Sequence, residues 1–315
     1  MKRVIIIILC LLIISYYCKA EDVNKYDNVR DVQEIIDDVV FVDNILVYYP
    51  STIDSAEYHI PEGTKGILSD AFRDATKIQN IYIPSSCMFI GMSFIEFNIT
   101  SIPYKSYYSF CNVENFFVDK ENKSFRDVCG VLYSKDLSIL YQYPLKREDT
   151  SFIIPEKVVE IGEYAFAYSN VQSISLPDSL RFIREGAFYN AHISNLALPS
   201  GLEEIGDEAF YGNRLTNIEF PETLLRIGAS AFESNCISCV ILPNNIEYLG
   251  TFCFFGNPIM ESTIIRLPKS LTYIGVDIFQ YGFSSEEYWT PVYSVSQDSY
   301  ALQWVINYNM NYIVQ

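Results

Sequence analysis

Side chains that commonly carry catalysis or bind metals are sparse in this chain of 315 residues. The two histidines, His59 and His192, match no HExxH pattern, and two are too few for the usual histidine-rich metal site. Cys236 and Cys239 form a CxxC pair, but no second CxxC supplies the two further ligands that zinc requires. The sequence also contains no GxSxG motif and no glycine-rich phosphate loop. We therefore expect no cofactor, no metal site and no enzymatic activity.

One further segment contains carboxylates that an enzyme could use. Residues 104–154 interrupt the repeat described below and include Asp119, Glu121, Asp127 and Asp136. Their spacing indicates no catalytic pair, so a secreted enzyme with its site in this segment is the less favoured alternative. A deep pocket holding a carboxylate of perturbed pKa would support that alternative.

The first 20 residues resemble a secretory signal peptide. Lys2 and Arg3 provide a positive start, residues 4–14 are continuously apolar, and Ala20 ends a candidate cleavage site. The apolar run is short for a membrane span, although an uncleaved anchor is the alternative. We expect a mature chain without a membrane span that is secreted or held at the cell surface. The net charge of −17 argues against nucleic acid or anionic lipid as a partner.

Six cysteines remain beyond this leader. Cys87 and Cys253 occupy apolar positions of the repeat, so we expect both to be core thiols. Cys111 and Cys129 share one segment outside the repeat, and they are the best candidates for a disulfide in an oxidising compartment.

Two asparagines begin the N-x-[ST] glycosylation sequon. Asn98 is followed by Ile99-Thr100, and Asn122 by Lys123-Ser124. Asn122 lies in a polar, turn-like stretch and is the better candidate. The sequon matters only if the source is eukaryotic.

A proline-anchored repeat organises most of the chain. Five of its prolines stand 22 residues apart, and others open units before and after them: Pro61, Pro84, Pro155, Pro177, Pro199, Pro221, Pro243 and Pro268. Apolar residues follow three and six positions after the proline, then Gly and Ala-Phe, as in Leu202, Ile205, Gly206 and Ala209-Phe210. A fixed period with fixed apolar offsets predicts a solenoid, in which each unit buries its apolar face against its neighbours.

We expect the strand of each unit to lie just before its proline. In residues 171–177, side chains one and three positions before Pro177 should point inward, and those two and four before it outward. Proline ends the strand because it cannot donate to a ladder, and stacking of the units makes a parallel sheet. The Gly after the sixth-position residue is interpreted as a tight turn. The phenylalanines of Ala-Phe are interpreted as a stacked internal column.

The pattern predicts six segments along the chain. They are a signal peptide (1–20), an N-terminal cap with a first Tyr-Pro hairpin (21–60), a short repeat block (61–103), an insert with a second Tyr-Pro hairpin (104–154), a main repeat block (155–283) and a C-terminal cap (284–315). In the C-terminal cap, residues 299–308 read as a short amphipathic helix with Ser299 as its N-cap. Residues 312–314 could add a last strand. Such caps cover the core that a bare terminal turn would expose.

These combined offsets resemble the BspA-type leucine-rich repeat family, whose pattern is roughly LPxxLxxIGxxAFxxCxxLxxIx. Residues 198–221 read LPSGLEEIGDEAFYGNRLTNIEFP, and the resemblance covers about residues 39–315. The cysteine after Ala-Phe is replaced by Asn213 and Asn235 in two units, and by Ser169 and Ala191 in two others. The resemblance implies a β-rich leucine-rich-repeat solenoid, with a stacked parallel sheet on the concave face and short turns, short strands or helical turns on the convex side. It also implies an exported adhesion or recognition protein, and it carries over no reaction and no site residues.

The outward positions before the prolines supply the candidate binding site. Near the end of the main block, Cys239, Ile241 and Ile264 come together beside Glu219 and Arg266. A contiguous exposed apolar cluster often marks a contact site, so we predict a partner-binding patch there. The alternative is that residues 284–298 fold back and cover it.

These observations favour a secreted or surface-displayed protein that mediates adhesion, or that recognises a protein or glycan, through its concave sheet. Binding would come from many shallow contacts across a preformed surface rather than from a deep pocket. A self-associating structural component of a surface coat is the alternative from another class.

Overall fold

The structure is a computed structural model that describes residues 33–36, 38–68, 71–92, 112–259, 263–279 and 291–315. It divides into two compact units: unit 1 comprises Met1–Asn112 and Phe117–Ser124, and unit 2 comprises Val113–Phe116 and Phe125–Gln315. The predicted signal peptide, 1–20, lies outside the described residues. The six segment boundaries expected from the sequence stay predictions.

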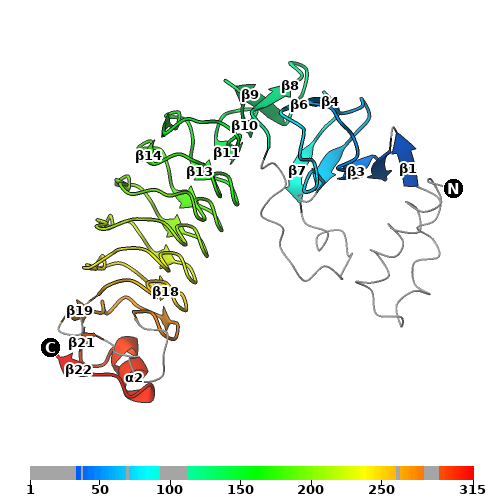
Figure 1. Ribbon diagram of the computed structural model, residues 1–315. Helices are drawn as coiled ribbons and strands as arrows, with labels where there is room; N and C mark the ends of the chain where they lie inside the picture. Colours follow the sequence, from blue (N-terminus) through cyan, green and yellow to red (C-terminus); the bar gives the residue numbers. More distant parts are fainter. Residues whose placement is uncertain (1–32, 37, 69–70, 93–111, 260–262, 280–290) are drawn as a thin grey trace, which may run out of the picture. The chain divides into compact units, whose positions relative to one another are not determined.

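Unit 1 contains two small sheets (Figure 1). One is formed by β1 (Gln33–Ile36), β2 (Val39–Val42), β3 (Ile45–Tyr48), β5 (Gly66–Leu68) and β7 (Phe89–Met92), and in the other β4 (Glu57–His59) pairs in parallel with β6 (Asn80–Ile83). The antiparallel pair of β2 and β3 confirms the first hairpin, and β3, β5 and β7 continue in parallel. The division between the units passes through β8 (Asn115–Val118).

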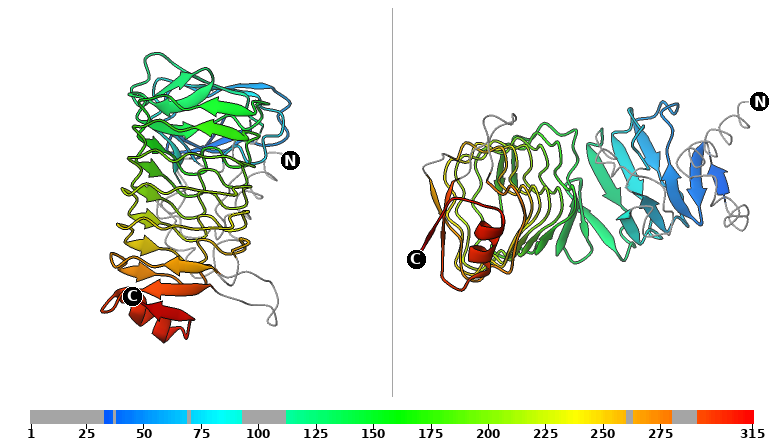
Figure 2. Two further views of the ribbon diagram at one scale, coloured as in Figure 1. Left: turned by 90° about the vertical axis from the view of Figure 1, so that its left-hand side faces the viewer. Right: turned by 90° about the horizontal axis from the view of Figure 1, so that it is seen from below.

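Unit 2 is a solenoid whose coils stack one on the next, as the green to orange part of Figures 1 and 2 shows. Its long sheet follows the chain through β9 (Phe125–Val128), β10 (Val131–Ser134), β11 (Ile139–Gln142), β13 (Glu160–Ile161), β15 (Phe182–Ile183), β16 (Glu204–Ile205), β17 (Arg226–Ile227), β18 (Tyr248–Leu249) and β20 (Tyr273–Ile274). The antiparallel pairing of β10 with β11 confirms the second predicted hairpin. From β11 onward every pairing is parallel.

Unit 2 also contains two short parallel sheets, built in part on segments that precede prolines. One pairs β12 (Ser151–Ile153) with β14 (Ser173–Ser175), and the other joins β19 (Ile264–Arg266), β21 (Val292–Val295) and β22 (Tyr312–Val314). Between β21 and β22 the chain forms the helix α2 (Tyr300–Asn307). The Ser299 hydroxyl accepts a hydrogen bond from the Leu302 amide at 3.1 Å, so the predicted N-cap is confirmed. In the described part of the chain, no helix reaches the length and hydropathy that a membrane span needs.

The long sheet does not run where the sequence analysis placed the strands. From β13 onward its strands hold the fifth and sixth residues after the proline of each unit. The Gly that follows opens a turn, as predicted, since the Ala165 amide donates to the Gly162 carbonyl at 3.3 Å. The Gly228 amide donates to the Ile205 carbonyl at 2.8 Å, and a Cβ on Gly228 would lie 2.4 Å from the Asp207 nitrogen. Glycine permits this close approach at Gly228, but the ladder also forms in the coil where Arg184 stands at this position, since the Arg184 amide donates to the Ile161 carbonyl at 3.0 Å. Within the described residues, the predicted ladder before the prolines forms between β12 and β14 and between β4 and β6 of unit 1, with one further bridge from Ser173 to Asn195, and it is missing in the middle of unit 2.

The core of unit 2 is a column of aromatic rings that confirms the predicted phenylalanine stack. Neighbouring ring centroids are 5.1–5.4 Å apart, along Phe166, Phe188, Phe210, Phe232, Phe254 and Phe279. Backbone bonds hold the rings in register: the Phe210 amide donates to the Ala231 carbonyl at 2.8 Å. Each ring packs in the offset, nearly parallel manner that aromatic pairs favour.

Three buried asparagines, Asn213, Asn235 and Asn257, stand where the family pattern has a cysteine after Ala-Phe, and each makes hydrogen bonds there. The Asn235 side-chain oxygen accepts from the Leu215 amide at 3.1 Å, and its nitrogen donates to the Phe210 carbonyl at 2.8 Å. Asn213 and Asn257 make the equivalent bonds to their preceding coils. An amide side chain can satisfy a donor and an acceptor together, which a thiol does only weakly. These residues therefore add a polar link between coils inside the core.

Cys87 and Cys253 are fully buried, which confirms that both are core thiols. Burial raises the pKa of the Cys87 thiol to about 12, and it raises the pKa of Cys253 as well. Since the thiolate is the reactive form, neither residue is suited to nucleophilic chemistry at neutral pH.

The close approach at the glycines predicts a marked cost for Gly228→Ala. The added methyl would meet backbone atoms of the preceding coil, and we expect a loss of about 1–3 kcal/mol in the free energy of unfolding, measured by urea denaturation. Gly201→Ala is the matched control, because its new methyl would meet only the flexible end of Arg181. Equal stability of both variants would contradict this role of Gly228.

Candidate functional site

The outward residues two and four positions before the prolines of unit 2 form a surface that we call the pre-proline face. All are exposed, and they comprise Ser151, Ile153, Ser173, Ser175, Asn195, Ala197, Asn217, Glu219, Cys239, Ile241, Ile264 and Arg266. Their inward neighbours Ile218, Val240 and Ile265 are buried, so the predicted alternation is confirmed here. Only two residues of this face are charged, although the whole chain has a net charge of −17.

Hydrogen bonding along the pre-proline face is interrupted in its middle. At one end β12 pairs with β14, and a single bridge links Ser173 to Asn195. At the other end β19 pairs with β21. Between them, within the described coils, no backbone hydrogen bond joins 217–219 to 239–241, or 239–241 to β19. Peptide groups in this stretch therefore rely on water or on a bound partner.

The structure places the five predicted patch residues on consecutive coils at this open stretch. Ile241 is 78% exposed and Ile264 58% exposed, while Cys239, Glu219 and Arg266 are also exposed. Residues 292–295 form β21, which pairs with β19 and leaves both isoleucines exposed. Residues 284–290, the first part of the segment expected to cover the patch, lie outside the described residues. The patch stays a prediction, now with a defined location.

The structure describes one cysteine of the predicted disulfide and one of the two predicted glycosylation sites. Cys129 is exposed and forms no disulfide with another described cysteine, and Cys111 lies outside the described residues, so their pairing stays a prediction. Asn122 is completely buried, and its side-chain nitrogen donates to the carbonyls of Pro84 at 2.7 Å and Cys87 at 2.9 Å. The preference for Asn122 as a glycosylation acceptor is therefore corrected, because the folded chain encloses the nitrogen that would be modified. Asn98 lies outside the described residues.

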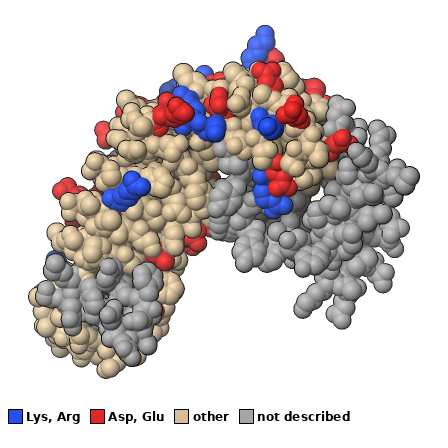
Figure 3. Space-filling model, in the orientation of Figure 1, with Lys and Arg blue, Asp and Glu red and all other residues tan. Residues whose placement is uncertain are grey.

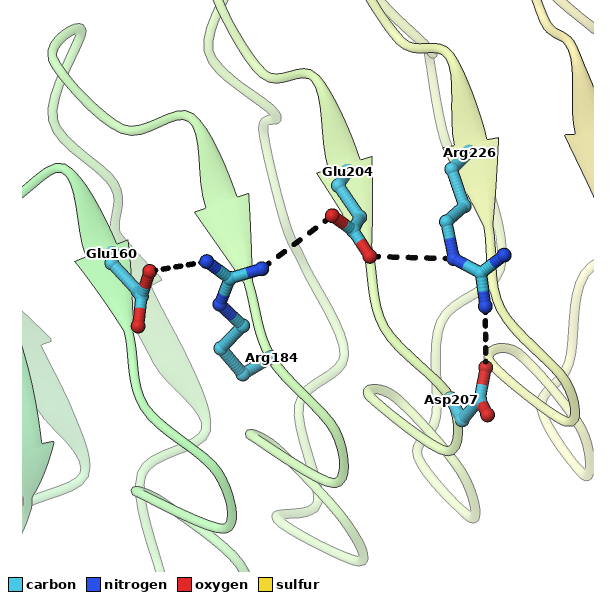
Figure 4. Close-up of polar contacts among 5 residues, drawn as sticks. All are labelled: Glu160, Arg184, Glu204, Asp207 and Arg226. Carbon is cyan, nitrogen blue, oxygen red and sulfur yellow. Dashed lines mark hydrogen bonds and ion pairs between the residues drawn. The ribbon is translucent and has the colours of Figure 1, made fainter.

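A second surface, on the long sheet, carries a chain of ion pairs that the sequence analysis did not find (Figure 4). Arg184 pairs with Glu160 and lies 3.5 Å from Glu204, while Arg226 lies 3.3 Å from both Glu204 and Asp207. The hydrogen bond that Arg184 donates to the Glu160 carboxylate raises the pKa of Arg184. Exposed pairs of this kind each stabilise by about 0–1 kcal/mol and are screened by salt. A partner on this surface would have to compete with bonds that the chain already makes.

Charged side chains are unevenly spread over unit 2. In the view of Figure 3 they gather over its first coils, and much of the described surface beyond them is uncharged. Interface centres are depleted in charged residues relative to the rest of a protein surface. Charge distribution therefore favours the pre-proline face over the ion-paired surface as a docking site.

Asp136, one of the four carboxylates considered for the enzyme alternative, has a structural role. Asp136 sits in the hairpin turn, where its carboxylate accepts from the Ser138 amide at 3.0 Å and from the hydroxyls of Ser138 and Ser134 at 2.7 Å. These bonds lower the pKa of Asp136 to about 2, the Ser138 amide contributing most. A general base needs a pKa near the working pH, whereas this carboxylate is held ionised to fix a turn.

Comparison with known proteins assigns the repeat. The family model for the BspA type leucine rich repeat region matches in six copies, over residues 48–129, 146–261 and 203–301. These matches span more than half of the chain, and the chain belongs to the BspA-type leucine-rich repeat family. The resemblance seen in the sequence is thereby confirmed. A search of curated protein sequences finds no match.

Solved structures show a more limited likeness. The pneumococcal vaccine antigen PcpA is 23% identical, with a TM-score of 0.46, over 81% of this chain and 61% of that one. A leucine-rich repeat protein from Eubacterium ventriosum is 16% identical, with a TM-score of 0.38, over 75% of this chain and 95% of that one. A leucine rich cell surface protein from Faecalibacterium prausnitzii is 22% identical, with a TM-score of 0.36, over 63% and 61%. This chain thus spans less than two thirds of PcpA, and likeness at this level does not inform its function.

The depressed pKa of Asp136 predicts a specific dependence of stability on pH. The stabilisation is fully present above the ordinary pKa of an aspartate, near 4, and it is lost as the pH falls toward about 2. We expect Asp136→Asn to lower the free energy of unfolding at pH 7, and the difference from wild type to shrink by pH 2. Asp178→Asn, at an exposed turn residue, is the control. A difference of equal size at both pH values would show that the carboxylate charge is not the cause.

Proposed function

We propose that this protein is secreted or displayed at the cell surface and binds another protein through the middle of the pre-proline face, centred on Ile241 and Ile264. One observation carries the proposal: these two apolar side chains are strongly exposed where the backbone ladder between coils is missing. Membership of a repeat family typical of binding proteins rather than enzymes supports it. The signal-like first 20 residues support export.

The energetics favour a protein partner for this stretch. Covering an isoleucine gains roughly 1.5–3 kcal/mol, and Ile241 and Ile264 are the largest apolar contributions available there. Short side chains such as Ala197 and Asn217 lose little conformational freedom on contact, which lowers the cost of association. Open peptide groups of 217–219 and 239–241 can pair with polar groups of a partner. Glu219 and Arg266, of opposite charge, would then fix its orientation.

Adhesion is the biological role that we infer from such a surface on an exported protein. Many shallow contacts on a preformed surface suit recognition of a large partner, as in other solenoids. A glycan is the less favoured ligand for this face, because two isolated isoleucines offer it neither ring stacking nor many hydrogen bonds.

The test compares binding of three forms of the purified protein to intact cells and to a panel of immobilised matrix proteins. They are wild type, the double variant Ile241→Asp with Ile264→Asp, and the single variant Ile153→Asp. The control is matched because Ile153 lies on the same face and is 77% exposed, against 78% for Ile241. We expect saturable binding by wild type and Ile153→Asp, and at least a tenfold weaker affinity for the double variant, since buried unpaired charges oppose association.

Circular dichroism and the melting temperature establish that each variant is folded before binding is compared. Unchanged binding by the double variant would refute the proposed location. Absence of saturable binding by wild type across the whole panel would refute the adhesion role.

A further inference from the structure

The strand β22 has an open edge. It lies at one end of its three-stranded sheet, beside β21, and no other described strand pairs with it (Figure 1). The Asn311 carbonyl accepts a hydrogen bond from β21 at 2.8 Å, and the Gln315 amide donates one to β21 at 2.9 Å. Because the peptide groups along a strand alternate in direction, those of Tyr312 and Val314 face away from β21. Within the described residues they lie on the open side of the sheet, where a further strand can pair with them.

The side chains of β22 leave apolar surface uncovered on both faces of the sheet. Tyr312 is in register with Tyr293, and Val314 with Val295, so the members of each pair lie on the same face. Tyr293 and Val295 are each 1% exposed, whereas Tyr312 is 42% and Val314 51% exposed. On the opposite face Ile313 is 43% exposed. A strand added to β22 would therefore cover apolar side chains on both faces.

Nothing in β22 opposes such pairing. Edge strands are commonly protected by charged side chains, prolines or bulges. β22 consists of Tyr, Ile and Val and pairs with β21 without a register shift, and Asp298 is the only charged side chain of residues 291–315. The whole chain has a net charge of −17, so two copies repel one another. That repulsion is weakest at this uncharged segment, which favours contact between copies there.

The strand is also complementary to itself. In an antiparallel pair centred on Ile313, Tyr312 of each copy lies opposite Val314 of the other, and each such pair exchanges both of its backbone hydrogen bonds. An aromatic side chain opposite a β-branched one is a favourable cross-strand pair. The two Ile313 side chains meet at the two-fold axis. The same patch on both copies thus forms the interface, as in most homodimers.

We propose that two copies of this chain pair through β22, antiparallel about a two-fold axis at Ile313, which joins their three-stranded sheets into one continuous sheet. The axis is perpendicular to the sheet, so the outward faces of both copies point to the same side. The two β19 strands, which carry Ile264, then lie roughly 24 Å apart, at about 4.8 Å per strand. A dimer would present two partner-binding stretches on that side. This consequence rests on the proposed function, whereas the pairing itself does not.

Analytical ultracentrifugation of the purified full chain, without any partner, tests the pairing. We expect a concentration-dependent equilibrium between one chain and two. Ile313→Lys places two like charges at the axis. Val314→Pro removes an amide that faces the open edge, where a strand tolerates proline. We expect each to weaken dimerisation roughly tenfold or more. Ile153→Lys is the control, because Ile153 is 77% exposed and lies on β12, and it should dimerise as wild type does.

Cysteine substitutions test the register. Ile313→Cys brings two thiols together at the axis, at the Cα separation of about 4.5 Å of a non-hydrogen-bonded pair, so oxidation should link two copies. Tyr312→Cys places each new thiol opposite Val314 and should link no more than wild type does. The exposed thiols of wild type set the background of this measurement: Cys129, Cys236 and Cys239.

Circular dichroism establishes that each variant is folded before self-association is compared. The proposal is overturned if wild type remains a single chain at all concentrations, or if Ile313→Lys and Val314→Pro both dimerise as wild type does. Equal weakening by Ile153→Lys, or equal linking of Ile313→Cys and Tyr312→Cys, would also overturn it. Partner binding enters none of these measurements, so they fail or succeed separately from the proposed function.

Discussion

The close approach of successive coils at the Ile-Gly positions is the contact on which the rest of unit 2 depends. A Cβ at Gly206, Gly228, Gly250 or Gly275 would lie 2.2–2.7 Å from backbone nitrogen atoms of the preceding coil. At these positions each amide donates to a carbonyl of the coil before, as the Arg184 amide does in the coil that has no Gly there, and this ladder fixes the spacing of the stack. That spacing in turn sets the 5.1–5.4 Å separation of the phenylalanine rings.

The same constraint explains why the pre-proline face is available to a partner. Backbone hydrogen bonds join successive coils at two places, at the Gly position and at the Ala-Phe position. Side-chain hydrogen bonds of buried asparagines such as Asn235 join them at a third place. Stacking is therefore secured without a continuous ladder before the prolines. The peptide groups of segments 217–219 and 239–241 can therefore remain without hydrogen bonds between coils, and Ile241 can remain exposed, at little cost to stability. Unpaired edges are hazards in most folds, and here they coincide with the candidate site.

Much of the fold followed from the sequence because apolar offsets report burial directly. The solenoid, the Phe166–Phe279 column, both hairpins and the Ser299 cap are confirmed. The main ladder was misplaced because its strands from β13 onward are two residues long, too short to show an alternation in the sequence, although the turn predicted at the following Gly is confirmed. The inward-facing Asn122 was missed because its bonds reach Pro84 and Cys87, more than 30 residues away. Helix α2 packs against β20, which lies far earlier in the chain, and no local pattern encodes that contact.

Residue-specific amide hydrogen exchange is the most direct test of where backbone hydrogen bonds join the coils. The structure places them at the Gly positions and not in the segments before the prolines in the middle of unit 2. We predict fast exchange for the amides of 217–219 and 239–241, and strong protection for Gly206, Gly228 and Gly250. Such a contrast would establish that the coils are hydrogen-bonded at the Gly positions, while the middle of the pre-proline face lacks hydrogen bonds between coils. Equal protection of the two groups would mean that the ladder continues before the prolines, and it would contradict both the open stretch and the binding role built on it.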